Sequence, residues 1–247
     1  MRILRAVYNR AVEQHLVAVH REPFRKVYTG VDKTRKRAID ENVILQLQQL
    51  DLNSHNHLRF ARDMFVFSYG MRGMAFVDMA YLRKDNVIKE TVVYSRRKTG
   101  QRLSVRIEPC IDAIIKRYSD ASAKSPYIFP IITSSNREQA YLQYQSALGY
   151  YNHQLKQLAG MVGVSVPLSS YTSRHTWATA ARKHNVPLAV ISEGMGHTSE
   201  QTTRIYLASL DNSVIDQANQ SLLSELNDNI FNKKCRLYAR NGNSGSE

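Results

Sequence analysis

Three kinds of side chain that suit phosphate chemistry lie within one short region of this 247-residue chain. Arg174 and His175 are followed by the pair Gly196 and His197, and then by Tyr206. A guanidinium binds the non-bridging oxygens of a phosphate with two parallel hydrogen bonds. An imidazole can donate to the same oxygens or move a proton near neutral pH. Because tyrosine becomes a covalent nucleophile once its proton is removed, these residues predict phosphoryl transfer that needs no metal.

The residues around this region form motifs that occur in the same order in a known protein family. They are Ser170 to Thr179, Met195 to Thr198 and Thr203 to Tyr206, preceded by Ser68 to Met74 and Arg97 to Gly100. Together these segments resemble the tyrosine recombinase, or phage integrase, family, and most of all the integrases of bacterial mobile elements. The resemblance runs from about Arg35 to Ala218.

The resemblance implies catalytic roles for residues in each motif. Tyr206 would attack the scissile phosphate and form a 3′-phosphotyrosyl link. Lys98, in the hairpin motif, would protonate the departing 5′-oxygen. Arg72, Arg174 and His197 would hold the pentacoordinate phosphorus and neutralise its growing charge. Preorganised charge of this kind is commonly the largest catalytic contribution.

Two positions depart from the family pattern. Tyr171 stands where the family has a histidine, three residues before Arg174. A phenol can hydrogen-bond a phosphate oxygen in the site, but it is a weak base at neutral pH. Ala75 stands where the family more often has a carboxylate, so Asp78 becomes the candidate to orient Arg72.

The charge of the chain indicates its partner. Lys and Arg number 34 against 21 Asp and Glu, which gives a net charge of +13. An excess of this size points to nucleic acid, with a merely solvated basic surface as the alternative. No run approaches the length of a transmembrane helix, so a membrane partner is not expected. The candidate DNA contacts are Arg96, Arg97, Arg204, Lys33, Arg35, Lys36 and Arg37.

No cofactor or metal site is expected from the sequence. The eight histidines include no H-E-x-x-H motif, and no Walker-type or dinucleotide glycine pattern occurs. Cys110 and Cys235 are too few and too distant for a zinc cluster or a disulfide framework. They fit a reducing cytoplasm. Together with the resemblance to bacterial integrases, this predicts a cytoplasmic protein associated with the bacterial nucleoid.

Hydrophobic periodicity predicts an α+β fold that is mostly α-helical and has a small three-stranded antiparallel sheet. Strands are expected at residues 86–88, 91–97 and 102–107, with a turn at 98–101. Helices are expected at residues 3–16, 40–50, 54–69, 110–121, 138–162, 169–184, 187–194 and 213–226. This order of elements resembles the catalytic fold of tyrosine recombinases.

Four segments are predicted along the chain. Residues 1–20 form the last helix of an N-terminal DNA-binding domain whose remainder this chain lacks, unless the helix packs on the catalytic core. Residues 21–37 contain Pro23, Gly30 and many basic side chains, as expected for an interdomain linker. Residues 38–230 form the catalytic domain, and 231–247 a flexible C-terminal tail.

The sequence favours a site-specific DNA recombinase or integrase that cleaves and rejoins double-stranded DNA through a 3′-phosphotyrosyl intermediate. Two alternatives stay open: a nicking-closing enzyme like the type IB topoisomerases, and a DNA-binding regulator with a decayed active site. The resemblance also implies a free monomer that assembles into a DNA-bound tetramer. The helix at 213–226 would dock on a neighbouring protomer, and a DNA-bending accessory protein is a further candidate partner.

Overall fold

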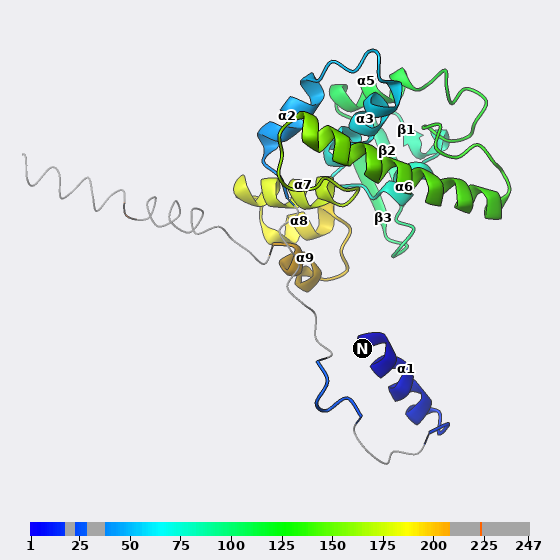
Figure 1. The fold of residues 1–247 in the computed structure, drawn as a ribbon, viewed down its shortest axis with the longest axis vertical. Coiled ribbons are helices and arrows are strands. Elements are labelled where there is room, and N and C mark those ends of the chain that lie inside the picture. The colour runs from blue at the N-terminus through cyan, green and yellow to red at the C-terminus, as the bar shows by residue number, and fades with distance from the viewer. Residues whose placement is uncertain (18–22, 29–37, 208–222, 224–247) are drawn as a thin grey trace, which may run out of the picture. The chain divides into compact units, whose positions relative to one another are not determined.

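The computed structural model describes residues 1–17, 23–28, 38–207 and 223 of the chain. Contacts between Cα atoms divide the chain into two units, Met1–Arg35 and Lys36–Glu247, and Figure 1 shows the elements of each. Within the described ranges, no helix is both long enough and apolar enough to cross a membrane.

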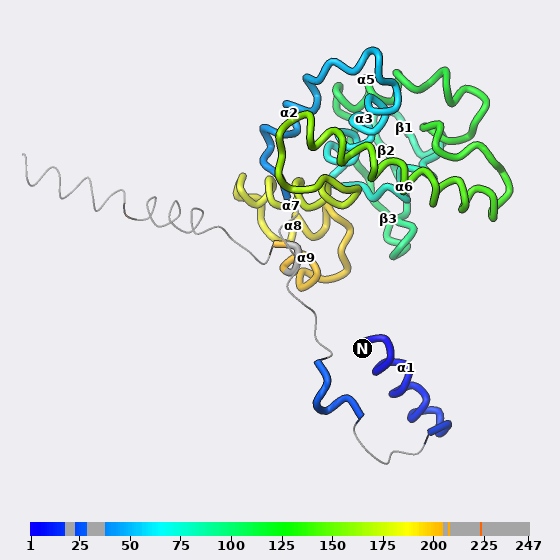
Figure 2. Tube along the Cα trace, viewed as in Figure 1, coloured from blue at the N-terminus to red at the C-terminus, as the bar shows by residue number. Residues whose placement is uncertain are grey.

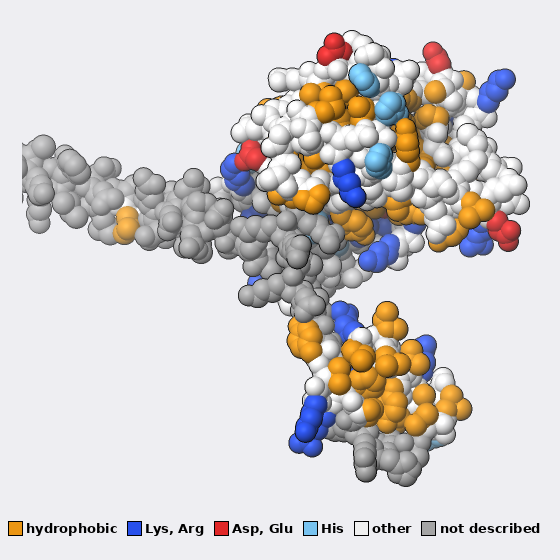
Figure 3. All heavy atoms as spheres, viewed as in Figure 1, with side chains coloured by type: hydrophobic (Ala, Val, Ile, Leu, Met, Phe, Trp, Pro, Cys, Tyr) orange, Lys and Arg blue, Asp and Glu red, His pale blue; other side chains and the backbone are white. Residues whose placement is uncertain are grey.

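The first unit contains α1 (Arg2–Glu13) and the short segment 23–28. The helix predicted here from the apolar spacing is confirmed by α1. Tyr8 packs edge-on against Phe24, with ring centroids 5.7 Å apart. The remaining apolar side chains of α1 are largely exposed, Ile3 at 82%. Figure 3 shows apolar side chains gathered on the visible face of this unit.

The second unit is built around one central helix, α3. Its helices are α2 (Glu41–Gln49), α3 (Asn56–Gly70), α4 (Phe76–Ala80), α5 (Pro109–Arg117), α6 (Arg137–Met161), α7 (Thr172–Lys183), α8 (Leu188–Gly194) and α9 (Glu200–Leu207). α3 packs against α2, α5, α6 and α7, so that Met64, Phe65 and Phe67 are fully buried. Figure 2 follows the chain through this arrangement.

A small antiparallel sheet completes the second unit. After the short helix η1 (Lys84–Asn86), the strands β1 (Val87–Ile88), β2 (Thr91–Ser95) and β3 (Arg102–Arg106) pair in the order β1-β2-β3. β2 ends at Ser95, two residues earlier than predicted. Arg96 and Arg97 therefore belong with Lys98 to the β2–β3 turn. Gly100 has φ +73° in this turn, and its N–H donates to the Arg96 carbonyl at 2.7 Å.

Sequence periodicity predicted the long helices and the short helix α8, but it missed α4 and α9. Five residues are too few to show an apolar period in α4, and the apolar residues of α9 all lie in its last turn. The helix predicted from residue 169 begins only at Thr172, with Tyr171 as its N-cap, and α5 ends earlier than expected, at Arg117. The helix predicted at 213–226, apart from Leu223, and the tail at 231–247 lie outside the described residues.

Two apolar clusters flank the N-terminal part of α7. The larger one contains the buried side chains of α3, the sheet, α5 and α6. The smaller one consists of Ala178, Ile191, Met195 and Leu207, and joins α7, α8 and α9. Because α7 packs on α3 and also on α8 and α9, it contacts elements of both clusters. The predicted fold class, mostly helical with one three-stranded antiparallel sheet, is confirmed.

Candidate active site

The turn between α3 and α4 packs directly on the first part of α7, with no side chain between them. Gly73 has φ +72°, and a Cβ at this position would lie 2.7 Å from the Cα of Arg174. The Ser68 and Ser173 hydroxyls form a buried hydrogen bond of 2.7 Å next to this contact. We call these residues, together with Arg72, the arginine joint. Only glycine at position 73 permits so close an approach.

Arg72 is presented by an unusual backbone conformation in this joint. Its φ is +57°, in the left-handed region that residues with a Cβ rarely adopt. The Ser68 carbonyl holds the turn by accepting the N–H groups of Gly73, at 2.8 Å, and Met74, at 3.2 Å. Strained backbone of this kind is often found at functional sites. The Arg72 side chain is half-buried, and its Cδ passes close to Gly194 at the end of α8.

Arg174 is buried and held by backbone carbonyls. Its side chain donates to the carbonyl of Gly73 at 2.8 Å and to that of Met195 at 2.6 Å, and only 3% of the residue is exposed. A buried guanidinium needs such acceptors, because burying a charge without partners is costly. The two carbonyls fix the position of the Arg174 guanidinium.

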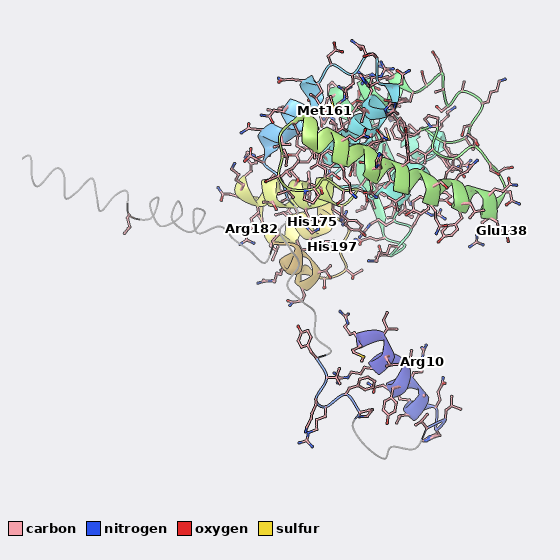
Figure 4. All side chains as sticks on the ribbon, viewed as in Figure 1. Arg10, Glu138, Met161, His175, Arg182 and His197 are labelled. Atoms are coloured by element: carbon pink, nitrogen blue, oxygen red, sulfur yellow. The ribbon has the colours of Figure 1, made fainter. Side chains whose placement is uncertain are left out.

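His197 lies in the loop between α8 and α9 (Figure 4), and it contacts Arg174. Its Nε2 is 3.1 Å from a guanidinium nitrogen of Arg174, and its Nδ1 is 2.8 Å from the Thr203 hydroxyl. Burial, followed by the charges of Arg174, Arg96 and Lys98, lowers the pKa of His197 to about 4. The imidazole is thus neutral at pH 7. Since a guanidinium can only donate, Nε2 accepts from Arg174 and Nδ1–H donates to Thr203.

The glycine before this histidine brings the β2–β3 turn into the site. Gly196 has φ +65°, and a Cβ there would lie 2.9 Å from the Cδ of Arg96. Arg96 is buried and donates a short hydrogen bond to the Gly196 carbonyl. A side chain at position 196 would push the β2–β3 turn away from the loop that carries His197.

We call residues 95–102, which form the β2–β3 turn and its ends, the lysine hairpin. Lys98 is exposed at its tip. The guanidinium of Arg97 stacks over the ring of Tyr81, 3.7 Å from its centroid. The backbone N–H of Arg97 donates to the Asp78 carboxylate at 2.8 Å. Asp78 therefore accepts a hydrogen bond from the lysine hairpin. The sequence had suggested Arg72 as its partner.

These elements enclose a cavity of about 120 Å³. Its lining residues are Ala75, Arg96, Lys98, Thr99, Tyr171, Arg174, Gly196, His197, Thr198 and Thr202. Three of them, Arg96, Lys98 and Arg174, have cationic side chains and none is acidic, so the cavity suits an anion. Four of the six residues predicted to be catalytic, Lys98, Tyr171, Arg174 and His197, thus meet in one place.

Tyr206 belongs to α9, but the structure describes only its backbone. Thr202, one turn earlier, lines the cavity, and Thr203 holds His197. Residues four apart on a helix share a face, so position 206 lies on the same face of α9 as position 202. Arg72 is not among the lining residues, although its turn touches Arg174.

The predicted DNA contacts fall into three groups. Arg96 is buried in the site, whereas Arg97 and Arg204 are exposed, with Arg204 3.7 Å from Glu200 on the same helix. The linker cations Lys33, Arg35, Lys36 and Arg37 lie outside the described residues. Within the described ranges, no group of three His, Cys, Asp or Glu side chains could hold a metal ion.

Sequence reasoning missed the residues that hold the site together. Thr203 and Gly73 were included only as members of the motifs Thr203 to Tyr206 and Ser68 to Met74. Arg96 was expected to contact DNA and not the Gly196 carbonyl. A signal existed for Gly73 and Gly196, because a glycine beside a candidate catalytic residue often marks close backbone approach. No local pattern pairs Arg96 with a carbonyl 100 residues away.

Comparisons with known proteins agree with this geometry. A model of the phage integrase family matches residues 37–213. The tyrosine recombinase XerD of Pseudomonas putida is 39% identical over 54 residues, which is 22% of this chain and 18% of that protein. XerD of Halalkalibacterium halodurans is 40% identical over 52 residues, 21% and 17% of the two chains. These matches span less than a fifth of either relative.

Solved structures show the same fold at low sequence identity. The integrase of the Tn1549 transposon in complex with a circular intermediate DNA has a TM-score of 0.58 at 14% identity, over 88% of this chain and 76% of that one. A lambda integrase dimer bound to a core site has a TM-score of 0.57 at 13% identity, over 82% of this chain and 69% of that one. XerA recombinase has a TM-score of 0.55 at 16% identity, over 74% of this chain and 65% of that one. With the family match covering most of its length, this chain belongs to the phage integrase family.

Proposed function

We propose that this chain is the catalytic part of a site-specific recombinase that cleaves and rejoins double-stranded DNA. The observation that carries the proposal is the cationic cavity, where three separate elements bring together Lys98, Arg174 and His197. α9, which carries Tyr206, forms part of its wall through Thr202. Membership of the phage integrase family supports the same reading.

The proposed reaction is an in-line exchange at phosphorus. The phenolic oxygen of Tyr206 forms a bond to the scissile phosphorus as the bond to the 5′-oxygen breaks. The departing oxygen takes a proton from Lys98, and the phenolic proton is lost to water. The product is a 3′-phosphotyrosyl link and a free 5′-hydroxyl. Because the link keeps the energy of the phosphodiester, attack by a new 5′-hydroxyl rejoins the DNA without ATP.

The charge on the phosphate is balanced by groups that are already in place. Arg174 is fixed by two carbonyls, and Arg72 approaches from the adjoining turn. A phosphate oxygen replaces Nε2 of His197 as an acceptor for the Arg174 guanidinium, which keeps its two carbonyl contacts. The imidazole can then take up a proton and donate to the phosphate, because a nearby anion raises the pKa of a histidine. Tyr171 lines the same cavity and supplies a further hydroxyl donor.

Double-stranded DNA and further copies of this chain are the proposed partners. The exposed cations Arg97 and Arg204, and the linker residues Lys33, Arg35, Lys36 and Arg37, would contact phosphates. A lambda integrase tetramer bound to a Holliday junction shares the fold, with a TM-score of 0.56 at 12% identity over 82% of this chain and 56% of that one. This likeness supports assembly on DNA into a tetramer, and we propose that the free protein is a monomer.

A suicide substrate tests the proposed function. DNA nicked close to a candidate cleavage site loses the short 5′-hydroxyl fragment after attack, so the covalent protein–DNA adduct cannot be reversed and accumulates. We expect such an adduct, and recombinant products from intact sites. Relaxation of supercoiled DNA without recombinants would favour the nicking-closing alternative. DNA binding with no adduct on any substrate would favour the regulator.

A further inference from the structure

The lysine hairpin meets the rest of the site at two points, one buried and one partly buried. One is the hydrogen bond from Arg96 to the Gly196 carbonyl. The other is the hydrogen bond of 2.8 Å from the Arg97 N–H to the carboxylate of Asp78. Lys98 follows directly after these two residues and is itself exposed. Because its four-carbon side chain is flexible, the place that its ammonium reaches depends on how the backbone of the hairpin is held.

The acceptor of the second hydrogen bond, Asp78, is a buried carboxylate, and acidic side chains are rarely buried. It lies on α4 and is only 5% exposed. Burial raises the pKa of this carboxyl above its usual value, although the Arg97 N–H and the charges of Arg96, Arg174 and Arg97 act in the opposite direction. A buried carboxylate is costly unless it is hydrogen-bonded and paired. Here the carboxylate accepts a hydrogen bond from the hairpin backbone, at the residue directly before the lysine.

We propose that Asp78 is a positioning residue for Lys98, and that it acts by anchoring the lysine hairpin. The carboxylate on α4 accepts the Arg97 N–H and so sets where the Lys98 ammonium meets the 5′-oxygen. α4 begins a few residues after Arg72, so one short stretch of chain presents the arginine and also anchors the lysine. The effect on catalysis rests on the proposed function. The anchoring of the hairpin does not, because it can be measured in the protein without DNA.

Hydrogen exchange in the DNA-free protein tests the anchoring. In Asp78→Ala, the Arg97 amide loses its acceptor, and its exchange measured by NMR should speed up about tenfold to hundredfold, the range for a hydrogen bond to a charged group. Asp63→Asn is the matched control, because Asp63 is an equally buried carboxylate that contacts Arg117 and Tyr118 on α5. It should leave exchange at Arg97 unchanged. Unchanged exchange in Asp78→Ala would overturn the anchoring.

Cleavage of two DNA substrates tests the consequence for the lysine. When a sulfur replaces the bridging 5′-oxygen, the leaving group departs as a thiolate and needs no proton. Asp78→Ala should cleave ordinary DNA at least tenfold more slowly than the unaltered protein, and the sulfur substrate at nearly the same rate. Lys98→Ala should behave alike, whereas Arg174→Ala should be slow on both. If Asp78 acted through Arg174, the sulfur would not rescue Asp78→Ala either, and the proposal would be wrong.

The two experiments separate failure of this inference from failure of the proposed function. If sulfur does not rescue Lys98→Ala, Lys98 is not the proton donor, and exchange at Arg97 still decides whether Asp78 anchors the hairpin. If Asp78→Ala does not fold, Asp78→Asn replaces it, because the amide keeps the acceptor oxygen and loses only the charge. It should show a smaller defect with the same selective rescue by sulfur. An equal defect on both substrates would overturn the positioning role.

Discussion

The arginine joint and the lysine hairpin bring charge to the same cavity by opposite means. In the joint, Gly73 lets backbone meet backbone, and the guanidinium of Arg174 is buried against two carbonyls. In the hairpin, Lys98 is exposed, and only its neighbours Arg96 and Arg97 are tied to the rest of the unit. In the proposed reaction, charge neutralisation is thus built into the packed interior, whereas proton donation depends on an exposed turn. Damage to the joint should therefore cost stability and activity together, and damage to the hairpin mainly activity.

Two glycines with the same backbone conformation give the largest expected contrast. Gly73→Ala puts a methyl group against the Arg174 backbone and should lower the free energy of unfolding by about 3 kcal/mol or more. Gly100, in the hairpin, has φ +73° and no heavy atom within 4 Å of an added Cβ. Gly100→Ala should cost only the backbone strain, about 1 kcal/mol. Denaturant unfolding of both variants measures the difference, and equal losses would mean that the joint is not tightly packed.

Removing Arg174 should lower the stability of the protein more than removing Lys98 does, just as Gly73→Ala should lower it more than Gly100→Ala. Arg174→Ala leaves the carbonyls of Gly73 and Met195 without this donor, and should cost about 1 to 3 kcal/mol of stability as well as a hundredfold or more in cleavage. Lys98→Ala should change stability by less than about 0.5 kcal/mol, although its cleavage also falls about a hundredfold. Thermal unfolding and adduct formation, measured side by side, check this. A large loss of stability in Lys98→Ala would contradict the expectation that Lys98 contributes to activity and not to stability.

The neutral state of His197 predicts a dependence of stability on pH. Its pKa is lowered to about 4, so between about pH 6.5 and 4 the unfolded chain binds a proton that the folded protein does not. Stability should therefore fall as the pH falls through this window. His197→Gln lacks the titrating group, and its unfolding midpoint should change less between pH 7 and pH 4.5. Identical pH profiles for the two proteins would show that His197 is not held neutral by burial beside Arg174.

The smallest expected effect concerns the exposed cations around the hairpin. Each phosphate contact contributes about −0.9 to the slope of log K against log salt concentration. Arg97→Ala should reduce the slope by about one such contact, without a large change in affinity at low salt. Lys116→Ala on α5 is the control, because this exposed lysine pairs with Asp112 and is not a candidate DNA contact. Equal changes in the two slopes would indicate binding by net charge alone.

The motifs around Arg174, His197 and Lys98 were predictable from sequence because each joins a functional side chain to a local pattern. The contacts that hold these motifs together were not, since they are made between distant segments. The Ser68–Ser173 hydrogen bond spans 105 residues and Arg96 to Gly196 spans 100. The short helices α4 and α9 were missed for a related reason. Tertiary packing, more than their own periodicity, stabilises helices of that length.

We propose that the nucleophile is Tyr206, on the helix whose Thr202 lines the cationic cavity. The most direct test is to trap the covalent adduct on a suicide substrate, digest the protein and map the DNA-bearing peptide by mass spectrometry. We predict that the nucleotide is attached to Tyr206, that Tyr206→Phe forms no adduct while it still binds DNA, and that Tyr171→Phe still forms one. Attachment to any other residue, or an adduct that persists in Tyr206→Phe, would contradict the account.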